Sequence, residues 1–218
     1  MKRYCLYLFI LIGISCSAEL KAQKNGTVYK GNDPAVRYTG RTLVSPDGSV
    51  AFDWVGTYLE TRFTGGKLSV KVSETGTSYY NVFVDGKLHK VVKVCGTDTL
   101  IHLVSGIDKR IHSLKIQKRS EGEFGKTTVH QFVLSGSGRL AEEPAVRTRH
   151  IEFIGNSLTC GYGTDGKHRD EPFLVETENC NLTFASMVAR YYDADYTLIA
   201  HSGRGAARNY GDSVRVSK

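Results

Sequence analysis

The sequence has few cysteines and no metal-binding pattern built from cysteine or histidine. Cys5 and Cys16 lie in the first 22 residues, which leaves Cys95, Cys160 and Cys180. These three can form at most one disulfide, with Cys160 and Cys180 the pair favoured by local context, so a dense disulfide framework is excluded. Cys95, on an apparent strand, is expected to be a buried apolar residue. Without C-x-x-C or H-x-x-x-H, the sequence indicates no metal and no cofactor.

Two further absences narrow the range of partners. The formal net charge is +7, yet no cluster of five or more basic residues occurs. Lys67, Lys71, Lys115 and Lys118 alternate with apolar residues, as on the solvent-exposed face of a sheet. No apolar run reaches the roughly 20 residues that span a bilayer. We therefore expect neither nucleic acid as a partner nor stable membrane insertion, and the oligomeric state is left open.

The N-terminus has the pattern of an export signal. Lys2 and Arg3 precede the apolar run from Leu6 to Ile14, and small and polar residues follow as far as Ala22. This pattern predicts a signal peptide over residues 1–22, cleaved near Ala22, and a secreted or periplasmic protein. Lipid attachment at Cys16 is disfavoured, because Gly13 stands where such sites usually carry leucine.

Residues 57–134 alternate between apolar and polar side chains in short segments separated by glycine turns. The expected strands are 68–72, 80–84, 88–94, 100–104, 111–117 and 128–134, with Asp85-Gly86 as a hairpin turn. No helical periodicity of useful length interrupts them. We therefore predict an all-β jelly-roll or β-sandwich domain over residues 23–145.

The pattern changes at Glu142-Glu143-Pro144, where a polar linker begins. An apolar strand is expected at 150–154 and another at 196–200, and between them Phe184, Met187, Val188 and Tyr191 recur at helical spacing. Strand, helix, strand predicts a parallel α/β arrangement over residues 146–218.

One serine stands at the end of the first of these strands. Gly155, Gly161 and Gly163 allow a sharp turn around Ser157, at the sheet edge where α/β proteins place their ligands. Glycine and serine are common in any turn, so this short pattern alone favours a structural loop. The surrounding residues change that interpretation.

The run Ile151–Gly163, IEFIGNSLTCGYG, resembles block I of the SGNH (GDSL-type) hydrolases, most closely in the form of carbohydrate esterase family 2. The resemblance continues through residues 176–212, ETENCNLTFASMVARYYDADYTLIAHSGRGAARNYGD. It implies a jelly roll followed by a flavodoxin-like α/β domain. It also implies a secreted serine esterase that removes O-acetyl groups from plant polysaccharides such as xylan or mannan, with the glycan itself undetermined.

The resemblance further implies residue roles. Ser157 is the nucleophile, and the backbone N–H groups of Ser157 and Gly203 are oxyanion donors. Asn156 replaces the usual aspartate and keeps a hydrogen-bonding side chain of the same size. The family's other parts are an asparagine from G-x-N-D and a histidine from D-x-x-H, and neither motif follows Gly205. We expect both beyond Lys218, and little esterase activity from residues 1–218 alone.

The histidines within the chain are expected to be structural or surface residues, including His168 in a polar loop and His201 at a strand end. Two other classes of protein compete with an esterase. A non-catalytic carbohydrate-binding β-sandwich could use aromatic side chains on sugars, the candidates being Trp54, Tyr58, Tyr79 and Tyr80. A structural surface protein would explain least of the sequence.

Overall fold

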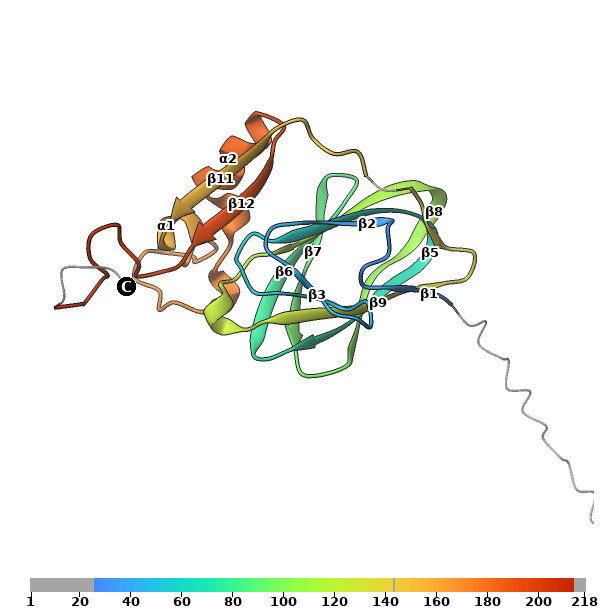
Figure 1. The fold of residues 1–218 in the computed structure, drawn as a ribbon, viewed down its shortest axis with the longest axis horizontal. Coiled ribbons are helices and arrows are strands. Elements are labelled where there is room, and N and C mark those ends of the chain that lie inside the picture. The colour runs from blue at the N-terminus through green and yellow to red at the C-terminus, as the bar shows by residue number, and fades with distance from the viewer. Residues whose placement is uncertain (1–25, 143, 214–218) are drawn as a thin grey trace, which may run out of the picture.

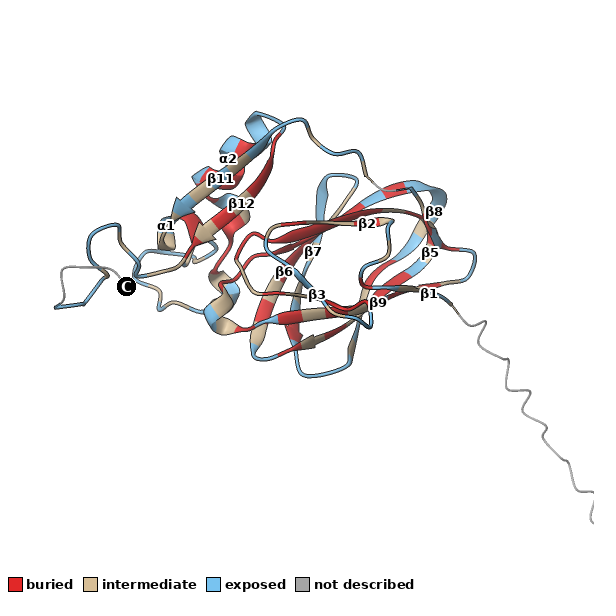
Figure 2. Ribbon diagram, viewed as in Figure 1, coloured by how far each residue is buried: buried red, intermediate tan, exposed pale blue. Residues whose placement is uncertain are grey.

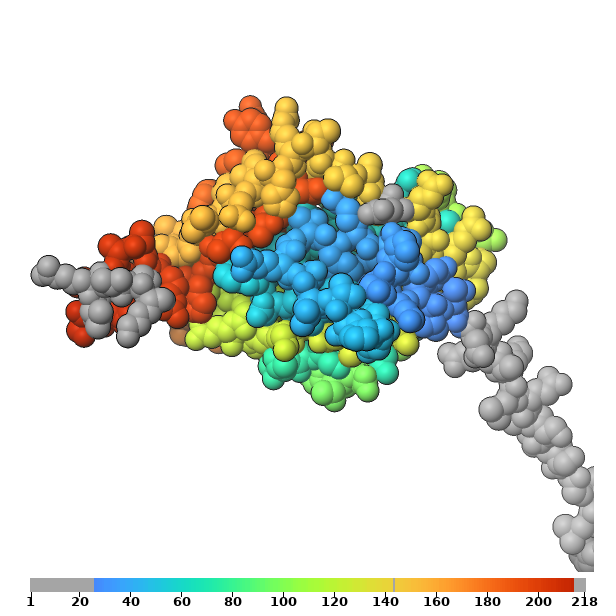
Figure 3. Space-filling view, in the orientation of Figure 1, coloured from blue at the N-terminus to red at the C-terminus, as the bar shows by residue number. Residues whose placement is uncertain are grey.

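The computed structural model describes residues 26–142 and 144–213. The predicted signal peptide and Cys16 lie outside these residues. The described chain has a large antiparallel β-sheet part followed by a small α/β part that packs against one end of it (Figure 1). In Figure 3 the orange and red C-terminal segments lie against the blue N-terminal strands.

The β part contains ten strands and a short 3-10 helix, η1 (Gly122–Phe124). The strands are β1 (Thr27–Lys30), β2 (Val36–Thr39), β3 (Leu43–Val44), β4 (Val50–Phe52), β5 (Tyr58–Glu74), β6 (Thr77–Val84), β7 (Lys87–Cys95), β8 (Thr99–Lys118), β9 (Thr127–Ser135) and β10 (Arg139–Leu140). Their order is β3-β4-β9-β5-β8-β6-β7, while β1 pairs with β9 and both β2 and β10 pair with β5. The predicted sandwich-like, mostly antiparallel region is confirmed; the 23–145 boundary stays a prediction.

Two long strands run through both halves of this sheet. The first half of β5 pairs with β2 and the second half with β9, and β8 accompanies it through both. Register shifts lie around Gly66, whose φ of +87° suits glycine, so the strands bend and enclose one apolar core. The segments 100–104 and 111–117, expected as two strands, are therefore one continuous β8.

The β6–β7 hairpin confirms the turn prediction. Asp85 and Gly86 both have positive φ, +49° and +75°, as a two-residue turn matched to strand twist requires. Cys95, at the end of β7, is exposed, so the expectation that it is buried was wrong. Cys160 and Cys180 are buried free thiols in one apolar cluster.

The α/β part begins with β11 (His150–Gly155), which pairs in parallel with β12 (Asp195–Ala200). Between them lie α1 (Ser157–Cys160), η2 (Val175–Thr177), η3 (Cys180–Leu182) and α2 (Phe184–Tyr191). The predicted strand–helix–strand order and parallel pairing are confirmed. No helix among the described residues is long and apolar enough to cross a membrane.

The α2 helix turns its small residues inward. Ala185, Ser186 and Ala189 are fully buried, whereas the larger apolar side chains that revealed the helix in the sequence are exposed (Figure 2). On the same part of the molecule, Ile154 and Leu158 are 81% and 76% exposed. The α/β part therefore carries an uncovered apolar surface, as expected for a sheet of two strands.

The two parts share a core and a buried polar interface. Val55 and Tyr58 of the β part join Leu198 and the cysteines of the α/β part in the second apolar cluster. A side chain at Gly56 would meet the Leu198 side chain at 2.6 Å. Asp195 accepts hydrogen bonds from Tyr58 Oη at 2.6 Å and from Arg37 at 2.7 Å. These contacts fix the orientation of one part on the other.

A run of five polar residues, Gln117 to Glu121, is buried in this interface with at most 2% of any residue exposed. Arg119 donates to the carbonyl oxygens of Glu178 and Glu176 at 2.7 and 3.0 Å. Lys118 is buried and donates to Gly125 O at 3.0 Å, so its placement on a solvent-exposed face was wrong. The Lys118 ammonium group instead points into the β part, where it also donates to Ser78 and lies near the ring of Tyr80.

Candidate active site

Ser157 lies where β11 ends and α1 begins. The Asn156 side chain accepts a hydrogen bond from Leu158 N–H at 3.2 Å, and the Asn156 carbonyl accepts from Thr159 and Cys160. Asn156 is thus the N-cap of α1, a role that asparagine and aspartate fill equally well. As the first helical residue, Ser157 keeps an N–H without an intrahelical partner. Its hydroxyl makes no hydrogen bond with any described residue.

Ser157 opens onto a cavity of about 1100 Å³ formed where the carboxyl ends of β11 and β12 meet the β part. Its lining combines the Ser157 turn, the loop after β12 and the segment around η1. The lining residues are Glu121, Glu123, Phe124, Asn156, Ser157, Tyr162, Phe173, Ser202, Gly203, Arg204, Gly205, Arg208, Asn209, Tyr210 and Gly211. Such a position at the strand ends is typical of ligand sites in α/β folds.

Gly203 lines the same cavity as Ser157. Its φ is +75°, a left-handed conformation that glycine adopts without strain, and its carbonyl accepts a hydrogen bond from Tyr210 N–H at 2.8 Å. The Gly203 N–H has no partner among residues 26–142 and 144–213. The structure therefore brings the predicted nucleophile and the predicted donor to one cavity, each with an unpaired N–H.

The loop that carries Gly203 is held by a residue of the β part, Glu121. The Glu121 carboxylate accepts a hydrogen bond from Ser202 N–H at 2.6 Å and a second one from the Ser202 hydroxyl. Glu121 is 1% exposed, so these are charge-assisted bonds in a dry environment. Ser202 directly precedes Gly203 in the chain. The two hydrogen bonds between Ser202 and Glu121 therefore set the position of the Gly203 N–H.

A second buried carboxyl group, that of Glu178, contacts the backbone of Glu121. Its Oε2 accepts from Glu121 N–H at 2.9 Å, and its Oε1 is buried without a partner among the described atoms. Burial and then the charge of Glu121 raise the pKa of Glu178 to about 9. The buried Glu178 carboxyl group therefore favours its protonated, uncharged form.

Glu121, Glu178 and Cys160 place one potential metal-ligand atom each within 4.8 Å of one another. Burial raises the pKa of the Cys160 thiol, which keeps it protonated. Both Glu121 oxygens already bind Ser202, and a cation would have to displace that loop. The geometry therefore favours a pair of buried glutamates, Glu121 and Glu178, that supports the Ser202 loop over a metal centre.

The aromatic wall of the cavity separates it from His168. Tyr162 and Phe173 stack with their ring centroids 3.6 Å apart, and this pair lines both the Ser157 cavity and a smaller cavity of about 310 Å³ that contains His168. Asp165-Gly166-Lys167-His168 has D-x-x-H spacing, but Asp165 is bound to Arg119 and Asn179. His168 therefore lies across the ring stack from Ser157, on an exposed loop.

His201 does not line the Ser157 cavity and contacts other groups. Its Nδ1 donates to Ser202 O at 2.8 Å, and its Nε2 lies 3.9 Å from a Glu123 oxygen. No histidine lines the Ser157 cavity within the described part of the chain. Other histidines have structural partners, as when His112, buried in β8, bonds Asp85 and Asp108.

The aromatic residues considered for sugar stacking are mostly not accessible. Tyr58 and Tyr80 are 1% and 3% exposed and belong to the two apolar cores. Tyr79 is half-buried and donates to Glu176 at 3.3 Å, while Trp54 is half-buried beneath Arg41. A sugar-binding face built from these four residues is therefore not present in this structure.

The sequence is similar to proteins of a known family. Residues 38–144 match the family described as Carbohydrate esterase 2 N-terminal. Cellulase/esterase CelE of Acetivibrio thermocellus is 34% identical over 180 residues, which are 83% of this chain and 22% of that protein. An acetylxylan esterase / glucomannan deacetylase of Cellvibrio japonicus is 32% identical over 78% of this chain and 48% of its own length. The chain thus spans half or less of these curated relatives.

Solved structures agree with this relation. A family two carbohydrate esterase from Clostridium thermocellum, determined in complex with cellohexaose, superposes with a TM-score of 0.78 at 34% identity over 82% of this chain and 55% of that one. A family two esterase from Cellvibrio japonicus gives 0.75 at 26% identity over 84% and 54%. The chain is thus similar to the esterases of carbohydrate esterase family 2, and its residues 38–144 match the N-terminal domain of that family.

Proposed function

We propose that the protein is a secreted or periplasmic serine esterase that removes O-acetyl groups from plant-type polysaccharides such as xylan or mannan through an acyl-enzyme on Ser157. The observation that carries the proposal is the shared cavity, in which the free Ser157 hydroxyl and the unpaired Gly203 N–H stand together at the end of a parallel sheet. The similarity to acetylxylan esterases / glucomannan deacetylases supports the substrate class. We further propose that residues 146–218 belong to a flavodoxin-like hydrolase domain.

The chemistry follows from these groups. Ser157 Oγ attacks the acetyl carbonyl carbon while a base accepts its proton, and the carbonyl oxygen becomes an oxyanion. The N–H groups of Ser157 and Gly203 donate to that oxyanion. Collapse breaks the bond to the sugar oxygen, which takes up the proton, and water then releases acetate from Ser157. The family resemblance implies that this base is a histidine.

The proposal is tested by covalent labelling. A fluorophosphonate probe should modify the full-length protein at a single serine, and peptide mapping should place the adduct on Ser157. Prior incubation with an acetylated xylo-oligosaccharide should slow labelling, because the acetyl group occupies the same cavity. An adduct on any other serine, or none at concentrations that label a control serine esterase, would refute the assignment of the nucleophile.

Glu121 gives a second test, since it acts on Gly203 only through the Ser202 loop. In Glu121→Gln one amide oxygen still accepts from Ser202 N–H, but both bonds lose their charge assistance, worth about 1 to 1.5 kcal/mol. We expect kcat for an acetyl ester to fall about tenfold with KM little changed. The change also removes the Glu121 charge that raises the pKa of Glu178, so the pKa of Glu178 should fall.

The matched control is Glu152→Gln, which alters an exposed glutamate on β11 outside the cavity. It should leave kcat and the pH–rate profile unchanged. Equal losses in both variants, or an unaltered kcat in Glu121→Gln with intact folding, would contradict a positioning role for Glu121.

A further inference from the structure

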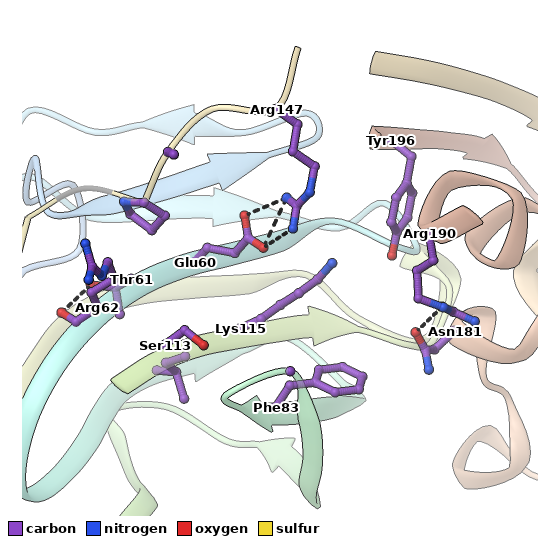
Figure 4. A pocket seen from close by; sticks show the side chains of 14 residues that line it. Glu60, Thr61, Arg62, Phe83, Ser113, Lys115, Arg147, Asn181, Arg190 and Tyr196 are labelled. Carbon is purple, nitrogen blue, oxygen red and sulfur yellow. Dashed lines mark hydrogen bonds and ion pairs between the residues drawn. The ribbon is translucent and has the colours of Figure 1, made fainter. Parts of the chain in front are cut away.

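A second cavity lies between the two parts of the molecule, away from Ser157. It has a volume of about 500 Å³ and is bounded by β5, β6 and β8 on one side and by the α/β part on the other (Figure 4). The only carboxylate among its lining residues is Glu60, whereas Arg62, Lys115, Arg147 and Arg190 supply four cations. The lining therefore has a positive excess among the described residues.

The charge of Glu60 is already neutralised. Glu60 forms an ion pair with Arg37 and accepts from both terminal nitrogens of Arg147, at 3.3 to 3.4 Å. Arg147 in turn contacts Asp195 at 2.8 Å. Arg147 also pairs with Asp193 at 3.2 Å, so this network of two arginines and three carboxylates carries one negative charge and offsets only part of the charge of the remaining cations, Arg62, Lys115 and Arg190.

Lys115 is the central cation of the cavity and forms no close ion pair with a described residue. Its Nζ stands 3.6 Å from the ring centroid of Tyr58 and 5.2 Å from that of Tyr196, and no carboxylate oxygen of the described residues lies within 4.0 Å of it. In Figure 4 the ammonium group reaches toward Tyr196 and Arg190 across the cavity. Burial lowers the pKa of Lys115 to about 8, and the more distant charges of Glu60 and Asp195 offset this effect only in part.

The opposite wall offers groups suited to a sugar. Arg190 donates to Asn181 Oδ1 at 2.8 Å, which leaves the rest of its guanidinium facing the cavity without an acidic partner in the described residues. The rings of Phe83 and Tyr196 supply apolar surface. A cavity of this size holds a small organic ligand, and its single deep ammonium group matches one carboxylate.

We propose that this interdomain cavity binds the carboxylate of a sugar acid, a uronate, with Lys115 as the principal ion-pair partner and Arg190 as a second donor. The choice of a sugar acid rests on the proposed polysaccharide substrate, while the carboxylate requirement rests on the charges of the cavity alone. The site would recognise an acidic unit of a glycan at a place separate from ester cleavage.

The test is calorimetric titration of the full-length protein with glucuronate, glucose, acetate and inorganic phosphate. Glucuronate should bind saturably below about 10 mM, and glucose, which differs by lacking the carboxylate, should not. Acetate should bind more weakly than glucuronate because it lacks the ring. Equal affinity for glucose would overturn the ionic mode, and equal affinity for phosphate, acetate and glucuronate would overturn the assignment to a sugar acid.

Variants locate the site. Lys115→Met keeps the apolar stem and removes the charge, and it should weaken glucuronate binding about 10- to 100-fold, as expected for a charge-assisted contact. Lys109→Met, an exposed lysine of the same strand outside the cavity, should leave affinity unchanged. Arg190→Gln, at an exposed position, provides a second loss-of-charge variant if Lys115→Met folds poorly. Unchanged affinity in either cavity variant with an intact fold would refute the site.

These titrations contain no ester, so their outcome is independent of Ser157 chemistry. Glucuronate binding without fluorophosphonate labelling would contradict the proposed esterase while leaving the anion site standing. Labelling at Ser157 without glucuronate binding would support the proposed esterase and contradict the anion site.

Discussion

Replacing Ser157 with alanine should lower hydrolysis of an acetylated chromogenic ester by the full-length protein by roughly 10⁴- to 10⁶-fold, the range seen when a catalytic serine is removed. The reason is that no neighbouring group can take over the attack. Asn156 is committed to capping α1, and the Ser202 hydroxyl is bound to Glu121. Initial rates for the two proteins under saturating substrate provide the measurement.

Two companion variants separate this effect from general disturbance. Ser105→Ala changes an exposed serine of β8 and should leave the rate unchanged. His168→Ala should also leave it unchanged, because the Tyr162–Phe173 stack lies between His168 and the Ser157 cavity. A large loss in His168→Ala would mean that this histidine is the base after a loop movement, and the assignment of the base would then be wrong.

The turn that carries Ser157 could be predicted from the sequence because its signals are local. A strand and a turn with glycine follow one another within about ten residues, and the structure places both as expected, while the capping role of Asn156 and the short helix α1 are additions from the structure. The second strand and the α2 helix were found in the same way. Hydrophobic periodicity predicts these strands and this helix because the local sequence mainly determines where each of them forms.

The support of the site could not be predicted because it crosses between the two parts. Glu121 and Ser202 are 81 positions apart, and the run from Gln117 to Glu121 looks like a solvated loop. Gln117, Arg119 and Glu121 find their partners in the α/β part, whereas Lys118 and Ser120 find theirs in the β part. A signal did exist, since five consecutive polar residues follow directly on an apolar strand, but polarity alone gives no hint of which partners bury it.

The α2 helix shows that hydrophobic periodicity can reveal a helix without revealing which of its faces is buried. Phe184, Met187 and Tyr191 revealed a helix, yet these side chains are 54%, 50% and 83% exposed, and the alanines on the other side meet β12. Spacing identifies a helix, whereas the size of the gap to the neighbouring strand decides which face is buried. Here the close approach of β12 favours small residues.

Replacing Gly203 with alanine should reduce kcat for ester hydrolysis by about 10²- to 10³-fold, the loss typical of one oxyanion donor, while KM changes little. No atom lies within 4 Å of the position of the new Cβ, so the substitution causes no direct clash. Its effect comes from the φ of +75°, which costs a residue with a side chain about 1 to 2 kcal/mol. The loop relieves this strain by rotating the peptide that presents the N–H to the cavity.

Gly136→Ala is the matched control for this strain. Gly136 has a φ of +72° and equally open surroundings, but it lies between β9 and β10, outside the Ser157 cavity. Both variants should lose a similar amount of thermal stability, since both force alanine into the left-handed region. Only Gly203→Ala should lose turnover, because only there does the relaxing peptide carry a donor. If both enzymes kept full kcat, the oxyanion would have to be stabilised without Gly203.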